Sequence, residues 1–166
     1  ILPPIKEERD KWGDFPIIAA GGIWDRDDIE KIMDLGADAV QLGTRFIGTH
    51  ECDASPVLKQ VLLDSKEEDI VIVSSPVGYP GRAVKTNLIK TLEPDTKKIK
   101  CISNCIFPCN RGEGARRVGY CIADSLGDAY LGRLQSGLFF SGANGYKLKE
   151  IVHVKDLIDE LMTDVK

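Results

Sequence analysis

Two glycine-containing pairs, Gly21-Gly22 and Gly43-Thr44, are the first candidates for chemistry in this sequence of 166 residues. Each pair follows a short apolar run of the kind that forms a buried strand. Glycine lets the backbone approach a phosphate closely, and N–H groups at the start of a helix favour an anion. The hydroxyl of Thr44 adds a further donor. The pairs therefore predict a phosphate site, although their spacing alone is equally consistent with ordinary turns at the ends of two strands.

A group of four cysteines offers a second kind of chemistry. Cys101, Cys105 and Cys109 follow one another at four-residue intervals, and Cys121 lies further along the chain. Four thiolates can bind zinc or an iron–sulfur cluster. This spacing departs from the usual C-x2-C pairs, and Pro108 interrupts any continuous helix through the first three cysteines. We expect reduced, partly buried thiols, with metal ligation as the alternative.

The sequence contains two histidines, His50 and His153. Neither has a neighbouring pattern that marks it as an acid or a base, so both are expected to be surface or capping residues.

The glycine pairs must be positioned by one predicted βαβ unit. Residues 17–20 predict a strand buried on both faces, and residues 37–42 predict a second, parallel strand. Asp25 is the expected N-cap of the helix between them, with Asp28 completing an arrangement like a capping box. Gly36 is expected to end this helix. The apolar side of the helix consists of Ile29, Ile32 and Met33.

The rest of the sequence predicts further helices and strands and contains no internal repeat. Ser55-Pro56 should begin a short helix, and residues 70–73 should form a strand. Helices are expected over residues 82–92, over residues 120–134 and over residues 152–162. The last of these is amphipathic, with Val154, Leu157, Ile158 and Leu161 on one face.

The composition is that of a folded globular protein, with 43% hydrophobic and 29% charged residues. The apolar runs are much shorter than the roughly 20 residues that cross a bilayer. A net charge of −4 gives no reason to expect nucleic acid or an anionic membrane as a partner. Together with the reduced cysteines, this favours a cytoplasmic protein.

One βαβ unit cannot cover both faces of a parallel sheet, and a complete (βα)8 barrel takes about 250 residues. The sequence also begins at Ile1 rather than at a methionine. We therefore expect an α/β chain that is the C-terminal part of a longer barrel protein, with most of the barrel preceding Ile1.

Four segments resemble the nitronate monooxygenase family, formerly called 2-nitropropane dioxygenase, which includes the FMN-dependent enoyl-ACP reductases. They are residues 16–23, 35–46, 75–83 and 137–145. The resemblance implies an FMN-binding (βα)8 TIM barrel with a smaller, loop-rich substrate domain. Its implied cofactor-binding positions are Gly21, Gly22, Gln41, Leu42, Gly43 and Thr44.

The same resemblance implies three parts of the chain. Residues 1–52 would be the last two βα units of the barrel, residues 53–140 an inserted substrate domain, and residues 141–166 a return segment with the C-terminal helix. Asn144 would face the substrate pocket. Members place their catalytic histidine in a Gly-Gly-His motif, which this chain lacks, so that histidine is expected before Ile1.

The implied function is FMN-dependent oxidation of alkyl nitronates with oxygen. The first alternative is an enoyl-ACP reductase that uses FMN and a nicotinamide donor, and the second is a metal-binding cysteine module without flavin activity. The implied partners are a small-molecule substrate and the missing N-terminal half of the barrel, and a homodimer remains open.

Overall fold

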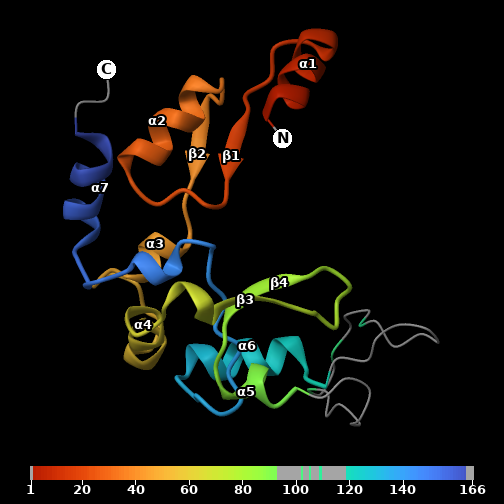
Figure 1. The fold of residues 1–166 in the computed structure, drawn as a ribbon, viewed down its shortest axis with the longest axis vertical. Coiled ribbons are helices and arrows are strands. Elements are labelled where there is room, and N and C mark those ends of the chain that lie inside the picture. Colours follow the sequence, from red (N-terminus) through yellow and green to blue (C-terminus); the bar gives the residue numbers. More distant parts are fainter. Residues whose placement is uncertain (1, 93–101, 103–104, 106–108, 110–118, 164–166) are drawn as a thin grey trace. The chain divides into compact units, whose positions relative to one another are not determined.

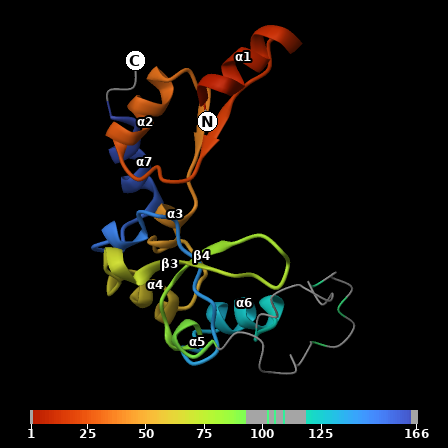
Figure 2. The ribbon, with the colours of Figure 1, turned by 45° about the vertical axis from the view of Figure 1, so that its right-hand side comes forward.

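The computed structural model describes residues 2–92, 102, 105, 109 and 119–163. The chain divides into two compact units, and Figures 1 and 2 show the helices and strands of each. The first unit consists of Ile1–Cys52 and Glu150–Lys166, and the second of Asp53–Lys149. Residues 141–149 lie in the second unit, and residues 150–166 lie in the first.

The first unit contains the predicted βαβ unit and three further helices. Its elements are α1 (Leu2–Trp12), β1 (Ile18–Ala20), α2 (Arg26–Asp34), β2 (Ala39–Gln41), α3 (Thr44–Ile47) and α7 (Val154–Met162). Strands β1 and β2 pair in parallel, with Ile18 opposite Ala39 and Ala20 opposite Gln41. The predicted parallel pair is thus confirmed.

The prediction that β1 is buried on both faces is wrong for this chain. Ile17, just before the strand, is 5% exposed, but Ile18 is 61% exposed. The reason is that the sheet formed by the described residues has two strands, β1 and β2. The faces and edges that a larger parallel sheet covers therefore remain open on these two strands.

Helix α2 begins as the sequence predicts. Asp25 is its N-cap, and the Oδ1 atom of Asp25 accepts the backbone N–H of Asp28 at 3.0 Å. The Oδ2 atom of Asp28 accepts the N–H of Trp24 at 3.0 Å, so the reciprocal bond falls one residue before the cap. Both carboxylates therefore satisfy N–H groups that the helix itself cannot.

Gly36 ends α2 in a left-handed conformation, with φ +93°. Its N–H donates to the carbonyl of Met33 at 2.8 Å, and the N–H of Ala37 donates to the carbonyl of Ile32 at 3.3 Å. This pair of bonds is a Schellman motif, which explains why glycine is needed here and confirms the predicted helix end.

Helix α7 packs against α2 within the first unit. Leu157 and Leu161 are buried, at 0% and 4% exposure, while Ile158 at 45% lies at the edge of the apolar face. A parallel bridge between Thr49 and Val152 joins the segment after α3 to the segment before α7. The predicted amphipathic helix is confirmed, and the bridge joins the segment before it to the segment that follows α3.

The second unit is mixed. Its elements are α4 (Pro56–Leu63), η1 (Glu67–Asp69), β3 (Ile70–Val73), β4 (Gly81–Val84), α5 (Asn87–Lys90), α6 (Ile122–Tyr130) and η2 (Gly145–Lys147). The Oγ atom of Ser55 accepts the N–H of Leu58 at 3.2 Å, which confirms Ser55 as the cap of α4. The predicted strand over 70–73 and the predicted helix within 120–134 are also confirmed.

The helix predicted over residues 82–92 is wrong. Its first part is β4, which pairs antiparallel with β3 so that Val73 lies opposite Gly81 and Ile70 opposite Val84. Helical structure is confined to the single turn of α5. Ala83 is fully buried in the strand, and the ladder with β3 together with this burial outweighs the local helical pattern.

The core of the second unit surrounds Leu138. This residue packs in one apolar cluster with Val73, Ala83 and Tyr120, all of them at most 4% exposed. The Tyr120 hydroxyl donates to the carbonyl of Ser74 at 2.8 Å, and burial raises the pKa of Tyr120 to about 12. The hydroxyl therefore remains a donor under ordinary conditions.

Candidate functional site

The ends of β1 and β2 meet at one edge of their sheet. Because Ala20 lies opposite Gln41 in a parallel pair, the two loops that follow leave the sheet side by side. All six sequence-predicted cofactor positions belong to these strand ends and loops, and the structure brings them together. They are Gly21 and Gly22 after β1, Gln41 at the end of β2, and Leu42, Gly43 and Thr44 after it.

The first loop exposes bare backbone. Gly21 and Gly22 have φ of +90° and +76°, a conformation that other residues adopt only with strain. A Cβ built on either glycine would have no neighbouring atom within 4 Å beyond its own chain neighbours. The loop therefore turns sharply and leaves open space above the main chain.

The second loop is equally open. Gly43 is the N-cap of α3, and its carbonyl accepts the N–H of Phe46 at 3.0 Å. A Cβ on Gly43 would also have nothing within 4 Å. Its φ of −121° needs no glycine, so the absence of a side chain matters for approach to the backbone rather than for the turn.

These observations fit a phosphate group. Two adjacent loops present glycine backbone next to open space that any side chain would fill, and Thr44 adds a hydroxyl at the start of α3. Backbone N–H groups in such loops bind phosphate without a cationic side chain.

Arg45, the residue after Thr44, links three elements of the first unit. Its Cζ atom lies 5.0 Å from the centre of the Trp24 ring, which follows the first glycine loop. Its Nη2 atom donates to both carboxylate oxygens of Glu160 on α7, at 3.1 and 2.9 Å. The Arg45 side chain is 11% exposed. No sequence pattern pointed to this residue, although it lies beside the predicted Gly43-Thr44 pair.

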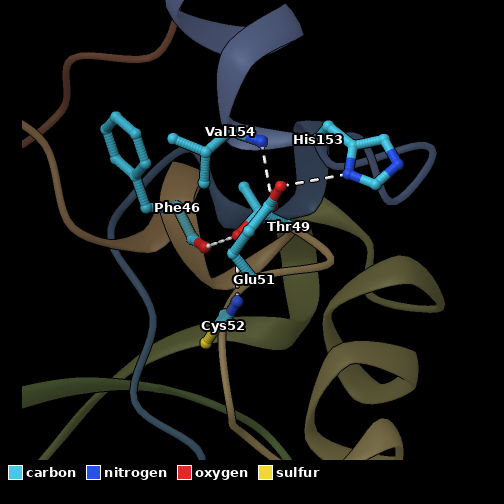
Figure 3. Close-up of polar contacts among 6 residues, drawn as sticks. All are labelled: Phe46, Thr49, Glu51, Cys52, His153 and Val154. Carbon is cyan, nitrogen blue, oxygen red and sulfur yellow. Dashed lines mark hydrogen bonds and ion pairs between the residues drawn. The ribbon is translucent and has the colours of Figure 1, made fainter.

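A second attachment joins the segment after α3 to the start of α7 (Figure 3). The Oε2 atom of Glu51 accepts the N–H of Val154 at 2.9 Å, and the other carboxylate oxygen lies 3.0 Å from Nδ1 of His153. The hydrogen bond from the Val154 N–H is the larger cause, and the contact with His153 the smaller one, that hold the pKa of the Glu51 carboxyl below its usual value. Glu51 is therefore a charged anchor for α7.

Thr49 stabilises the same segment from within. Its Oγ1 atom donates to the carbonyl of Phe46 at 2.8 Å and accepts the N–H of Cys52 at 3.3 Å (Figure 3). Thr49 is 1% exposed. The chain is thus held by buried polar contacts from α3 to the point where it enters the second unit.

The two histidines lie together near this anchor. The rings of His50 and His153 have centroids 4.5 Å apart. His153 occupies the N-cap position of α7, but its side chain makes no capping bond. Both histidines are exposed, which agrees with the surface role given as one of the two expectations, and the capping bond at the start of α7 comes from Glu51.

Asn144, the predicted substrate-pocket residue, belongs to the second unit. It precedes η2, where its carbonyl accepts the N–H of Lys147 at 3.0 Å, and it is partly buried. Its assignment to a substrate pocket remains a prediction from the resemblance.

The cysteine cluster is only partly described. Cys105 is exposed, Cys109 is partly buried and Cys121 is buried, and all three are free thiols, as is Cys52. Cys101 lies outside the described residues. Among the residues that the structure describes, no three His, Cys, Asp or Glu side chains are grouped so as to hold a metal ion. The described part of the chain also contains no helix that is long and apolar enough to span a bilayer.

Comparison with protein families gives one match that covers almost the whole chain. The profile described as Nitronate monooxygenase matches residues 3–164. A protein named "Probable nitronate monooxygenase" from Staphylococcus saprophyticus is 39% identical over 75 residues, which are 45% of this chain and 21% of that protein. One from Staphylococcus haemolyticus is 36% identical over 79 residues, 48% of this chain and 22% of that protein. The matches span about a fifth of each of these relatives.

Solved structures give a consistent result. A point mutant of FabK from Thermotoga maritima superposes with a TM-score of 0.67 and 26% identity, covering 93% of this chain and 42% of that one. A nitroalkane oxidase from Streptomyces ansochromogenes gives a TM-score of 0.66 at 21% identity, covering 99% of this chain and 42% of that one. The second likeness bears on the α/β fold alone. In both cases this chain corresponds to less than half of the solved protein.

Proposed function

The chain belongs to the nitronate monooxygenase family, and from this membership we propose that it forms the phosphate-binding end of an FMN-dependent (βα)8-barrel oxidoreductase. The observation that carries the proposal is the pair of open glycine loops at the shared edge of β1 and β2. Loops after the last strands of such barrels commonly bind phosphate. The family and the local geometry therefore support the same group at the same place.

In this proposal the chain's own residues bind and orient the cofactor. Gly21-Gly22 and the segment from Gln41 to Thr44 offer backbone and hydroxyl groups to the FMN phosphate. The bound flavin supplies the capacity to accept electrons from a substrate and to pass them on. Anchoring the phosphate fixes the position of the flavin relative to the barrel mouth.

The remaining strands of the barrel are the proposed partner of the first unit. Trp12 on α1, Ile18 on β1 and Leu35 at the end of α2 are 80%, 61% and 50% exposed, and the exposure of Ile18 departs from the burial on both faces that parallel strands usually have. Additional parallel strands and helices of the same longer protein would cover them. The acid–base histidine is proposed to lie in that portion, since His50 and His153 occupy the α7 anchor.

The proposed reaction is oxidation of an alkyl nitronate with oxygen, because the curated relatives bear the name nitronate monooxygenase. Asn144 and the second unit would contact the substrate. Reduction of an enoyl thioester with a nicotinamide donor is the competing activity, suggested by the resemblance to a family that includes such reductases.

The deciding experiment uses the full-length protein. We expect it to purify with flavin absorption bands near stoichiometric level, and to consume oxygen when an alkyl nitronate is supplied. Flavin reduction by a nicotinamide donor, with turnover of an enoyl thioester and none of the nitronate, would establish the reductase instead. A protein that carries stoichiometric zinc or iron and no flavin would refute both enzymatic proposals.

A further inference from the structure

Arg45 contacts groups from two other parts of the first unit although it belongs to a single turn of helix. Its guanidinium lies over Trp24, which follows Gly21-Gly22, and it bonds to Glu160 in the last turn of α7. Arg45 itself directly follows Gly43-Thr44. One side chain therefore joins both glycine loops to the C-terminal helix.

The position of α7 is itself determined at both ends. At its start, Glu51 accepts the Val154 N–H, and the N–H of His50 donates to the carbonyl of Val152 at 2.9 Å. Near its end, Glu160 bonds to Arg45. Leu157, between these points, and Leu161, directly after Glu160, are both buried. Helix α7 is thus attached before and after its middle to the segment that contains α3.

The geometry does not suit Arg45 for binding a phosphate by its charge. The side chain is 11% exposed, one face lies on Trp24, and both oxygens of Glu160 accept from its Nη2. Its Nε is buried with no hydrogen-bond acceptor among the described residues. A guanidinium held in this way can orient the loops around it, but its positive charge is already offset by a carboxylate.

We propose that Arg45, held by Trp24 and Glu160, is a positioning residue that keeps the two glycine loops at the spacing needed to bind the FMN phosphate. The proposal rests on the proposed function, because it assumes that these loops bind that phosphate. It adds α7 to the cofactor site as the element against which α3 is held. In this proposal Arg45, Trp24 and Glu160 affect the affinity of the protein for FMN through the position of the loops rather than through contact with the phosphate.

The test compares two glutamates that pair with partly buried arginines. Glu160→Gln removes the charge that holds Arg45 between elements. Glu30→Gln removes the charge that holds Arg26, with an Nη2–Oε1 distance of 2.8 Å, within α2 alone. The exposures match, at 11% and 52% for the Arg45–Glu160 pair and 20% and 58% for the Arg26–Glu30 pair. The control therefore loses a similar ion pair that joins no separate elements.

The affinities of the full-length, flavin-free protein for FMN and for riboflavin, which lacks the phosphate, are measured by fluorescence titration. We expect Glu160→Gln to weaken FMN binding about fivefold, the size of effect that a partly buried ion pair supports. Riboflavin affinity should be unchanged, and Glu30→Gln should alter neither affinity by more than about twofold. A loss confined to FMN distinguishes positioning of the phosphate loops from general destabilisation.

An equal loss of FMN and riboflavin affinity in Glu160→Gln would overturn the proposal, as would a loss of FMN no larger than in Glu30→Gln. If Glu160→Gln does not fold, Arg45→Lys serves instead, since lysine retains a charge but lacks the planar guanidinium that lies over Trp24 while its Nη2 donates to Glu160. The same selective loss of FMN is expected for it. A wild-type protein that binds no FMN would refute the proposed function itself, whereas FMN binding without the selective loss refutes only the role of Arg45.

Discussion

The Glu51 carboxylate accepts the backbone N–H of Val154 at 2.9 Å across 103 positions of the sequence. This bond places a negative charge at the start of α7, where the unpaired N–H groups of a helix favour it. It also attaches the end of the α3 segment to the C-terminal helix. A single exposed carboxylate therefore acts both as a helix cap and as a connection between distant segments.

We predict that Glu51→Gln reduces the amount by which the free energy of unfolding falls as the pH is lowered. The pKa of Glu51 is lowered from its ordinary 4.5 in the folded state, first by the Val154 N–H and then by His153. A lowered folded pKa means that the stabilisation is fully present above pH 4.5 and is lost as the pH falls through the folded value. The glutamine variant should therefore be less stable than the wild type at pH 7 and equally stable at strongly acidic pH.

Urea unfolding of the full-length protein between pH 7 and pH 2 would measure this difference. Glu150→Gln is the matched control, since Glu150 is exposed and has no hydrogen bond or ion pair within the described chain. Its unfolding free energy should follow that of the wild type. A difference between wild type and Glu51→Gln that persists unchanged to pH 2 would contradict the role assigned to the ionised carboxylate.

Gly43→Val is expected to weaken FMN binding by about tenfold or more, which corresponds to about 1.4 kcal/mol. The fold should tolerate the change, because Gly43 has φ −121° and its Cβ would meet nothing within 4 Å. The added side chain would instead enter the space through which the phosphate approaches. Flavin absorbance per protein after purification, with the thermal midpoint of the flavin-free form as the control, gives the measurement. Unchanged flavin occupancy would exclude this loop as the phosphate site.

Gly137→Ala should destabilise the second unit by about 1–3 kcal/mol, as overpacking does elsewhere. Its Cβ would lie 2.8 Å from the carbonyl oxygen of Arg133 and 3.0 Å from the Cα of Ala129, and neither backbone atom can move independently. Gly127→Ala is the matched control within α6, where the Cβ meets nothing within 4 Å. It should stabilise by about 0.5–1 kcal/mol, because alanine favours helix over glycine. Urea unfolding should therefore give opposite signs for the two variants.

Tyr120→Phe should cost about 1 kcal/mol, the usual contribution of one hydrogen bond, because the bond to the Ser74 carbonyl is lost. Burial raises the pKa of Tyr120 from 10.0 to about 12. The buried, protonated Tyr120 therefore contributes fully to the free energy of unfolding below pH 10. This contribution declines as the pH rises towards 12. The phenylalanine variant should lack this decline, which unfolding measurements between pH 9 and pH 12 would detect. A parallel decline in both proteins would mean that other groups cause it.

Local signals predicted the ends of elements well. The caps at Asp25, Gly36 and Ser55 each depend on hydrogen bonds between residues at most five positions apart, so the sequence alone contains the whole motif. The parallel pairing of β1 and β2 could be predicted for a similar reason, because a short crossover helix between two apolar runs favours it.

The features that were predicted wrongly or missed depend on residues far away in the sequence. Residues 82–84 are a strand because they pair with β3, whose residues lie on the other side of an intervening loop. The exposure of Ile18 reflects which strands are present beside β1, which its own sequence does not encode. The Arg45–Glu160 pair spans 115 positions, and no local pattern distinguishes those two residues from other surface charges. The adjacency of the two glycine loops followed from the predicted parallel pair, whereas the side chains that hold those loops could not be predicted.

The bridge between Thr49 and Val152 has a consequence for the order of folding during synthesis. The first unit is completed by Glu150–Lys166, so it cannot close while the ribosome is still making Asp53–Lys149. The second unit is continuous in sequence, so it can fold before the first unit is complete. The bridge holds the chain segments before and after the second unit side by side. A short linker from Cys52 to Glu150 could therefore replace Asp53–Lys149 and leave the two segments of the first unit paired. We therefore expect the first unit to fold without Asp53–Lys149 when such a linker joins its two segments.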